Sequence, residues 1–140
     1  TGCHNGNEMR NATCADTQIS IEWPYCSLLC CDLAVPKNMA NNQHIYEAMK
    51  ERNVDMAFIG ARRGNGSLKT KFYSVEGVVL SFTNWYPQEP NNENEGCVEM
   101  IYKTNYHSYQ KNGTQDFGGQ WNDKSCGTRR RYICQLSLEK

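Results

Sequence analysis

The sequence predicts an α+β domain, because its helical patterns lie early in the chain and its strand patterns mostly late. Its 140 residues suit a single domain with a real core, spanning residues 1–140. Eight cysteines in so short a chain indicate disulfides and an oxidising compartment. The chain has no CxxC pair and no Cys/His cluster at zinc spacing, so disulfides are favoured over zinc.

The N-terminal region carries two cysteines in a polar setting. Cys3 and Cys14 lie within residues 1–18, and a disulfide between them would close a small hairpin. Residues 19–31 have the pattern of a strand entering a short helix, and residues 32–38 that of a buried strand ending in a turn.

A second helix is predicted over residues 39–52. Asn38 can cap its first turn, because an Asn side chain accepts from the free amides there. Ile45, Ala48 and Met49 recur at helical spacing, which predicts a buried face.

The rest of the chain favours strands joined by loops. Residues 56–61 are short and apolar, as in a core strand, and Glu76-Gly77 divides residues 72–85 into two expected strands. Residues 86–94 lack periodicity and predict an irregular loop of potential function. Residues 103–118 are polar and predict an inserted loop. Further strands are expected at residues 97–102, 119–123 and 130–136.

Oxygen-bearing side chains are concentrated in "EPNNENEG", residues 89–96, and in "WND" at residues 121–123. Calcium takes about six to eight oxygen ligands from carboxylates, amide carbonyls and water. The candidate ligands are Glu89, Asn91, Glu95, Asn122 and Asp123. A cis Glu89–Pro90 peptide would turn both flanking side chains toward one point. The alternative is a plain polar surface loop, in which Asn and Glu are common.

An EF-hand does not fit this loop. Asn91, Glu93, Glu95 and Gly96 match loop positions one, three, five and six, but the twelfth position holds Tyr102 instead of the required Glu.

Two stretches carry a resemblance to a known family. "TNWYPQEPNNENEGCVEM" and "GGQWNDKSCGTRRRYICQL" together resemble the C-type lectin domain, in the manner of the collectins, and the resemblance runs from Cys26 to Leu136. It implies a C-type lectin-like fold of two helices, two small antiparallel sheets and a long calcium-binding loop. It also implies the disulfides Cys26–Cys134 and Cys97–Cys126, while Cys3–Cys14 matches the family's long-form hairpin.

The same resemblance implies a function. Glu89, Asn91, Glu95, Asn122 and Asp123 would hold one calcium ion and also contact the sugar, with Pro90 in cis and Trp121 in the core. A calcium ion with spare coordination binds two vicinal sugar hydroxyls, while Glu accepts and Asn donates to them. The Glu-Pro-Asn order resembles the mannose type, so the expected partners are glycans bearing mannose, GlcNAc or fucose.

Two features depart from the family pattern. The positions of an auxiliary calcium site fall near Arg63, Ser67, Asn92 and Gly96, which lack carboxylates, so we predict that this site is absent. Within residues 103–118, aromatic residues could extend the sugar contacts, but we favour an exposed loop, because long loops tolerate insertions without function. The residues concerned are Tyr106, His107 and Tyr109.

Cys30 and Cys31 have no counterpart in the pattern. They either join each other in a strained vicinal disulfide or link two chains. We favour the link, because a disulfide-linked homodimer would strengthen weak single sites.

The remaining observations concern location and rival functions. Three Asn-x-Ser/Thr sequons, at Asn11, Asn65 and Asn112, agree with a secreted, extracellular protein in its mature form. The net charge of zero and the lack of a long apolar run argue against nucleic acid or membrane insertion. No nucleophile motif accompanies the histidines, so we expect no enzyme. A C-type lectin-like module that binds protein, with structural calcium, remains the alternative.

Overall fold

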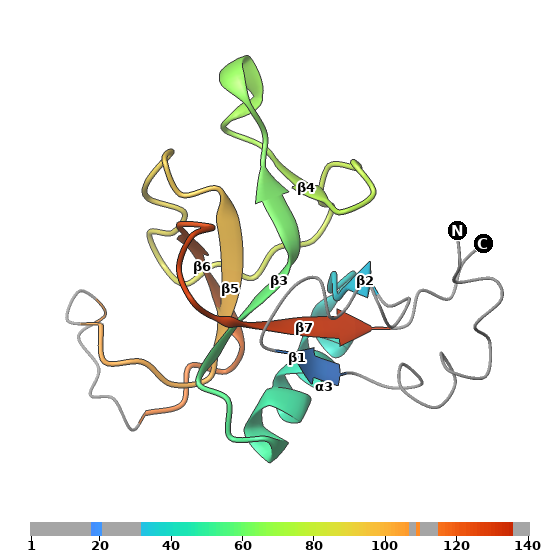
Figure 1. The fold of residues 1–140 in the computed structure, drawn as a ribbon, viewed down its shortest axis with the longest axis vertical. Helices are drawn as coiled ribbons and strands as arrows, with labels where there is room; N and C mark the ends of the chain where they lie inside the picture. Colours follow the sequence, from blue (N-terminus) through green and yellow to red (C-terminus); the bar gives the residue numbers. More distant parts are fainter. Residues whose placement is uncertain (1–17, 21–31, 107–108, 110–114, 136–140) are drawn as a thin grey trace, which may run out of the picture.

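The computed structural model describes residues 18–20, 32–106, 109 and 115–135 (Figure 1). Several sequence-based predictions therefore lie outside the described residues. They are the hairpin with Cys3–Cys14, the first helix, Cys26, the pair Cys30 and Cys31, His107, and the sequons at Asn11 and Asn112.

A seven-stranded sheet organises the described residues, with strands in the order β1-β7-β3-β5-β6. Two short strands extend it, since β2 pairs with β7 and β4 pairs with β3. Neighbouring strands are antiparallel, except that β3 and β7 run parallel. The strands are β1 (Gln18–Ser20), β2 (Asp32–Leu33), β3 (Met56–Arg63), β4 (Phe72–Ser74), β5 (Cys97–Ile101), β6 (Gln120–Lys124) and β7 (Arg131–Gln135).

The α+β class is confirmed, but the two separate sheets that we expected are joined into one. The connection is β3, which is longer than the predicted strand at residues 56–61. Its first half pairs with β7 through Ala57 and Phe58, and its second half pairs with β4 through Ala61 to Arg63. A register shift against β5 between Phe58 and Arg62 lets one strand serve both halves.

Helix α3 (Met39–Glu51) forms as predicted. The Asn38 side chain accepts a hydrogen bond from the Asn41 amide at 2.8 Å, which satisfies one free donor of the first turn. Ile45, Ala48 and Met49 are buried, as the helical spacing required. Asn42 also lies on this buried face, and its Oδ1 accepts from Trp121 Nε1 at 2.8 Å, so the helix is tied to the sheet.

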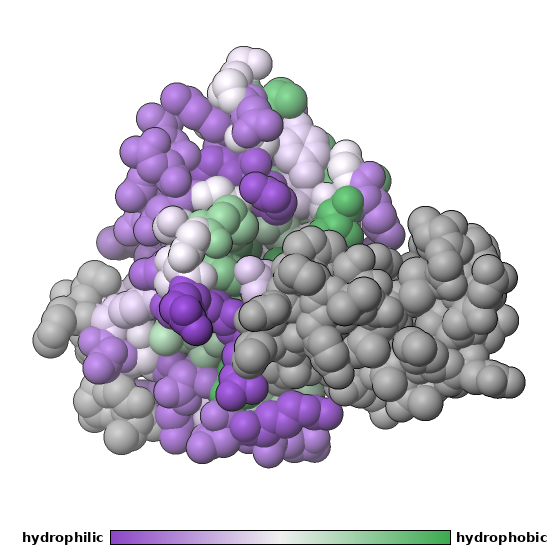
Figure 2. Space-filling view, in the orientation of Figure 1, coloured by the Kyte–Doolittle hydropathy of each residue, from purple (hydrophilic) through white to green (hydrophobic). Residues whose placement is uncertain are grey.

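The second strand predicted within residues 72–85 does not form. Only Phe72–Ser74 is a strand, and Val79 and Trp85 make isolated bridges. Val75, Val78 and Val79 are 40%, 62% and 49% exposed, and Figure 2 shows a hydrophobic area beside β4. β-branched residues favour a strand when their side chains pack on a core, but these valines return along β4 with exposed side chains, and only the bridge from Tyr73 to Val79 forms.

The hydrophobic core lies around Trp121 of β6. Trp121 is completely buried with Val98, Met100 and Ile133, as the resemblance implied for that tryptophan. The disulfide Cys97–Cys126 is confirmed and joins the start of β5 to the turn after β6. Cys134 is also disulfide-bonded, but its expected partner lies outside the described residues. Among the described residues, no helix is long and apolar enough to cross a membrane.

Candidate functional site

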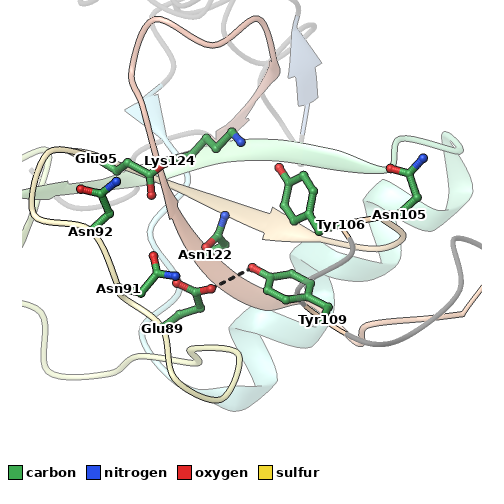
Figure 3. A pocket seen from close by; sticks show the side chains of 9 residues that line it. All are labelled: Glu89, Asn91, Asn92, Glu95, Asn105, Tyr106, Tyr109, Asn122 and Lys124. Atoms are coloured by element: carbon green, nitrogen blue, oxygen red, sulfur yellow. Dashed lines mark hydrogen bonds between the residues drawn. The ribbon is translucent and has the colours of Figure 1, made fainter.

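An open pocket of about 630 Å³ lies where the long loop meets β6 (Figure 3). Four of the five predicted ligands line it: Glu89, Asn91 and Glu95 from the loop and Asn122 from β6. The Glu89–Pro90 peptide is cis, as predicted. The rest of the wall is formed by Asn92, Asn105, Tyr106, Tyr109 and Lys124.

Asp123, the fifth predicted ligand, is not part of the pocket wall. Its side chain is completely buried, and its carboxylate accepts from the Asn91 amide at 3.2 Å and the Asn92 amide at 3.0 Å. Its Oδ2 also accepts from Arg63 Nη2 at 2.8 Å. The Asp123 side chain therefore fixes the loop that carries Glu89 and Asn91.

Glu89 is held in an electrostatically unfavourable place. Its Oε2 accepts from the Tyr109 hydroxyl at 3.3 Å, while its Oε1 is buried without a hydrogen-bond partner. Burial and the neighbouring Asp123 carboxylate together raise the pKa of Glu89 to about 7. Burial and Asp123 also raise the pKa of Glu95. Carboxylates that face each other without a donor require a proton or a cation between them.

This arrangement predicts a pH dependence of the metal-free protein. Between the ordinary pKa of 4.5 and the native value of about 7, folded Glu89 holds a proton that the unfolded chain has lost. The free energy of unfolding in EDTA is therefore expected to fall as the pH rises through this window. Thermal unfolding from pH 5 to 8 measures the slope, and Glu89→Gln should reduce it. Equal slopes for both proteins would contradict the assignment.

A buried network behind the pocket orients Asn122. Glu99 is completely buried in β5, and its Oε2 accepts from Asn122 Nδ2 at 2.8 Å and from the Tyr106 hydroxyl at 2.9 Å. Its Oε1 accepts from Arg130 Nε at 2.7 Å, and Arg130 Nη2 donates to the Tyr106 hydroxyl at 2.7 Å. Because the Asn122 amide nitrogen donates to Glu99, its Oδ1 is the end available to a cation.

The described part of the inserted loop packs against the site, so our preference for an exposed loop was wrong there. Tyr109 is only 5% exposed and belongs to a small core cluster with Ile101 and Phe117. The Tyr86 and Tyr109 rings lie 4.1 Å apart between centroids, and the Tyr86 hydroxyl donates to the Tyr109 carbonyl at 2.9 Å. Tyr106 and Tyr109 thus become pocket wall.

Arg63 has a role that the sequence reasoning missed. We had considered it only as a position without a carboxylate, but its guanidinium binds the back of the long loop. Beyond Asp123, it donates to the carbonyl oxygens of Glu95 at 3.0 Å, Lys69 at 2.8 Å and Asn92 at 3.0 Å. Its side chain is 8% exposed, and it also lies 4.7 Å above the Phe72 ring centroid. A fixed positive charge therefore sits inside the loop.

Among the described residues, no three His, Cys, Asp or Glu side chains are grouped closely enough to form a metal site by themselves. A cation in this pocket would therefore also need the amide oxygens of Asn91 and Asn122. Such a mixture of carboxylate and amide oxygens suits calcium, which tolerates many oxygen ligands in flexible geometry.

The fold and the oxygen-lined loop together define a C-type lectin-like domain. Solved structures of this class are similar to the chain. The mouse scavenger receptor C-type lectin carbohydrate-recognition domain matches with a TM-score of 0.64 and 18% identity, covering 84% of this chain and 86% of that one. A Ca²⁺-dependent type II antifreeze protein, in its Ca²⁺-free form, matches with a TM-score of 0.63 and 17% identity, covering 84% and 88%.

A third similar structure is the C-type lectin domain of murine dendritic cell inhibitory receptor 2 in complex with N-glycan. It has a TM-score of 0.58 and 19% identity, and the match covers 86% of this chain and 90% of that one. The profile of the family described as "Lectin C-type domain" matches residues 23–136. The chain belongs to this family, whose members generally bind calcium and glycans and are generally not enzymes.

Proposed function

We propose that this protein is a calcium-dependent lectin of the collectin-like type that binds mannose-type sugars through one calcium ion. The proposed ligands are Glu89, Asn91, Glu95 and Asn122, which line the pocket, and Asp123, whose carboxylate lies behind the wall and also holds the loop. The observation that carries the proposal is the buried, unpartnered Oε1 of Glu89 beside the Asp123 carboxylate. A divalent cation would satisfy the oxygen and offset the repulsion between the carboxylates.

The pocket residues have different roles in the proposed sugar binding. Bound calcium supplies coordination positions for two vicinal hydroxyl oxygens. Glu89 and Glu95 offer only acceptors, whereas Asn91 and Asn122 offer an oxygen to the metal and amide hydrogens to the sugar. The Nδ2 of Asn122 already donates to Glu99, so Asn91 is the less committed of the two amides. Equatorial 3- and 4-hydroxyls, as in mannose, suit this donor and acceptor order.

One calcium ion suffices in this proposal, because Arg63 already supplies a positive charge behind the loop. Its guanidinium binds Asp123, two carbonyls of the long loop and the carbonyl of Lys69. A second cation at the same place would be repelled by it. We also propose that the protein is secreted and that a disulfide-linked homodimer presents two such sites.

The relatives support the lectin function at the level of the fold. One similar structure is named a carbohydrate-recognition domain, and another was solved with an N-glycan. The alternative is a protein- or ice-binding module in which calcium only holds the loop. The similarity to a Ca²⁺-dependent antifreeze protein is the observation that supports this alternative function.

Retention on immobilised mannose tests the function. We expect the protein to be retained in calcium, released by EDTA, and eluted by free mannose but not by free galactose. Glu89→Gln should lower retention at least about tenfold, because it removes a charged ligand. The matched control is Glu93→Gln, since Glu93 lies in the same loop but forms its described ion pair with Lys69 at the surface.

The other results each have a distinct meaning. Elution by galactose in preference to mannose would contradict the mannose specificity but would still support a carbohydrate-binding function. No retention in calcium, with calcium still raising the melting temperature, would favour the protein-binding module.

A further inference from the structure

The charges around the pocket do not cancel once calcium is bound. Asp123 pairs with Arg63 at 2.8 Å, and Glu99 pairs with Arg130 at 2.7 Å. Glu89 and Glu95 then remain, and their two negative charges match one Ca²⁺. Lys124 is the remaining charged residue of the pocket wall, and it forms no ion pair with any described residue.

Lys124 is also placed where a ligand can reach it. It is the last residue of β6, directly after Asp123, and its side chain is half-buried. Figure 3 shows it extending away from Glu95 and toward Tyr106, with Asn105 beyond, on the side of the pocket away from Glu89 and Asn91. The Lys124 ammonium therefore lies beside the calcium-binding oxygens rather than among them.

Tyr106 holds this ammonium in position. The Lys124 Nζ lies 4.8 Å from the centroid of the Tyr106 ring, which is a cation–π distance. The ring itself is fixed, because its hydroxyl donates to Glu99 Oε2 at 2.9 Å and accepts from Arg130 Nη2 at 2.7 Å. An aromatic ring orients a lysine without accepting hydrogen bonds from its three N–H donors, and the charge of Lys124 acts at a distance on Glu95, which calcium would bind in the loaded site. Asn105 adds an exposed amide on the same side.

We propose that the calcium-loaded pocket selects acidic sugars: a mannose-type ring on the calcium, whose exocyclic carbon carries a carboxylate or sulfate that Lys124 binds. The inference rests on the proposed function and names the ligand class of the same site. Calcium makes the selection possible, because it neutralises the charges of Glu89 and Glu95, which would otherwise repel an anion in the same pocket.

Three probes that differ only at this carbon test the proposal. They are methyl α-mannoside, its 6-O-sulfate and the methyl α-glycoside of mannuronic acid, which carries a free carboxylate. Each is used to compete with calcium-dependent binding of the protein to a mannose column. We expect the wild-type protein to prefer an anionic probe over the neutral one by about fivefold at low salt, the upper range for a partly exposed ion pair. The preference should shrink as the salt concentration rises. Preference for the sulfate alone or the carboxylate alone would identify the anion and support the proposal.

Two variants separate Lys124 from a general effect of charge. In Lys124→Gln the ratio of anionic to neutral affinity is expected to fall to about one, because the attraction is lost. The matched control is Lys103→Gln, since Lys103 also lies over a tyrosine, 4.9 Å from the Tyr102 ring centroid, but outside the pocket wall. This control should keep the wild-type ratio.

Several results would overturn the proposal. Equal binding of the three probes by the wild-type protein would do so, as would an unchanged preference in Lys124→Gln. If Lys124→Gln does not fold, the salt dependence of the wild-type ratio decides, and a preference independent of salt would contradict it. Failure of the underlying function is recognised separately, because the wild-type protein would then not bind neutral methyl mannoside in calcium.

Discussion

Replacing Arg63 with methionine is expected to lower the free energy of unfolding in EDTA by about 3–5 kcal/mol, the cost of leaving one partner of a buried ion pair alone. Asp123 is completely buried, and the Arg63 side chain is 8% exposed, so solvent screens this pair little. The three backbone carbonyls that Arg63 binds would also lose their donor. Chemical denaturation in EDTA measures the loss.

Calcium should reduce this loss, because a cation near Asp123 restores a positive charge to its carboxylate. A calcium titration of the wild-type protein should give one bound calcium per chain. The matched control is Arg62→Met, since Arg62 is exposed and its described contact is a weak one, 4.0 Å from Nη2 to Cys126 Sγ. That variant should change stability by no more than about 0.5 kcal/mol. Equal losses in the free energy of unfolding for the two variants would contradict the stabilising role of the buried Arg63 charge.

Glu99→Gln is expected to cost a similar amount, about 3–5 kcal/mol, and to weaken calcium binding as well. The carboxylate accepts from three different residues, whereas an amide must point hydrogens at one of them. The Arg130 side chain is 16% exposed and would lose its counter-charge. Asn122 would lose the bond that directs its oxygen toward the pocket. Denaturation and calcium titration measure the two effects.

A double-mutant cycle with Arg130→Met isolates the pair. If Glu99 and Arg130 act as one unit, the double variant should be less destabilised than the sum of the single variants, because no charge is left buried alone. Glu93→Gln again serves as the control, because Lys69 and Glu93 are 48% and 59% exposed and their pair contributes about 0–1 kcal/mol. Additive losses in the cycle, or a calcium affinity unchanged in Glu99→Gln, would contradict the network.

Features that depend on neighbouring residues could be predicted from the sequence. Asn38 and the spacing of Ile45 and Met49 predicted α3, because a cap and a buried helical face are defined within one or two turns. The concentration of oxygen-bearing residues in one loop predicted the pocket residues Glu89, Asn91 and Glu95. The disulfide Cys97–Cys126 came from the family resemblance and not from spacing.

The tertiary structure decided the features that join distant residues. Arg63 meets Asp123 across 60 positions of the chain, and Arg130 meets Glu99 across 31, so no local pattern announces either pair. The same holds for Tyr109, a polar-loop residue in sequence that becomes buried because Phe117 and Tyr86 pack against it. The exposed valines after β4 show the reverse case, since their strand propensity yields only the bridge from Tyr73 to Val79 and no buried packing. The sequence by itself thus determined which side chains carry the chemistry. Only the packing of β3, β5 and β6 decided which of them face the pocket and which hold it in place, because burial and charge pairing depend on neighbours brought together by the fold.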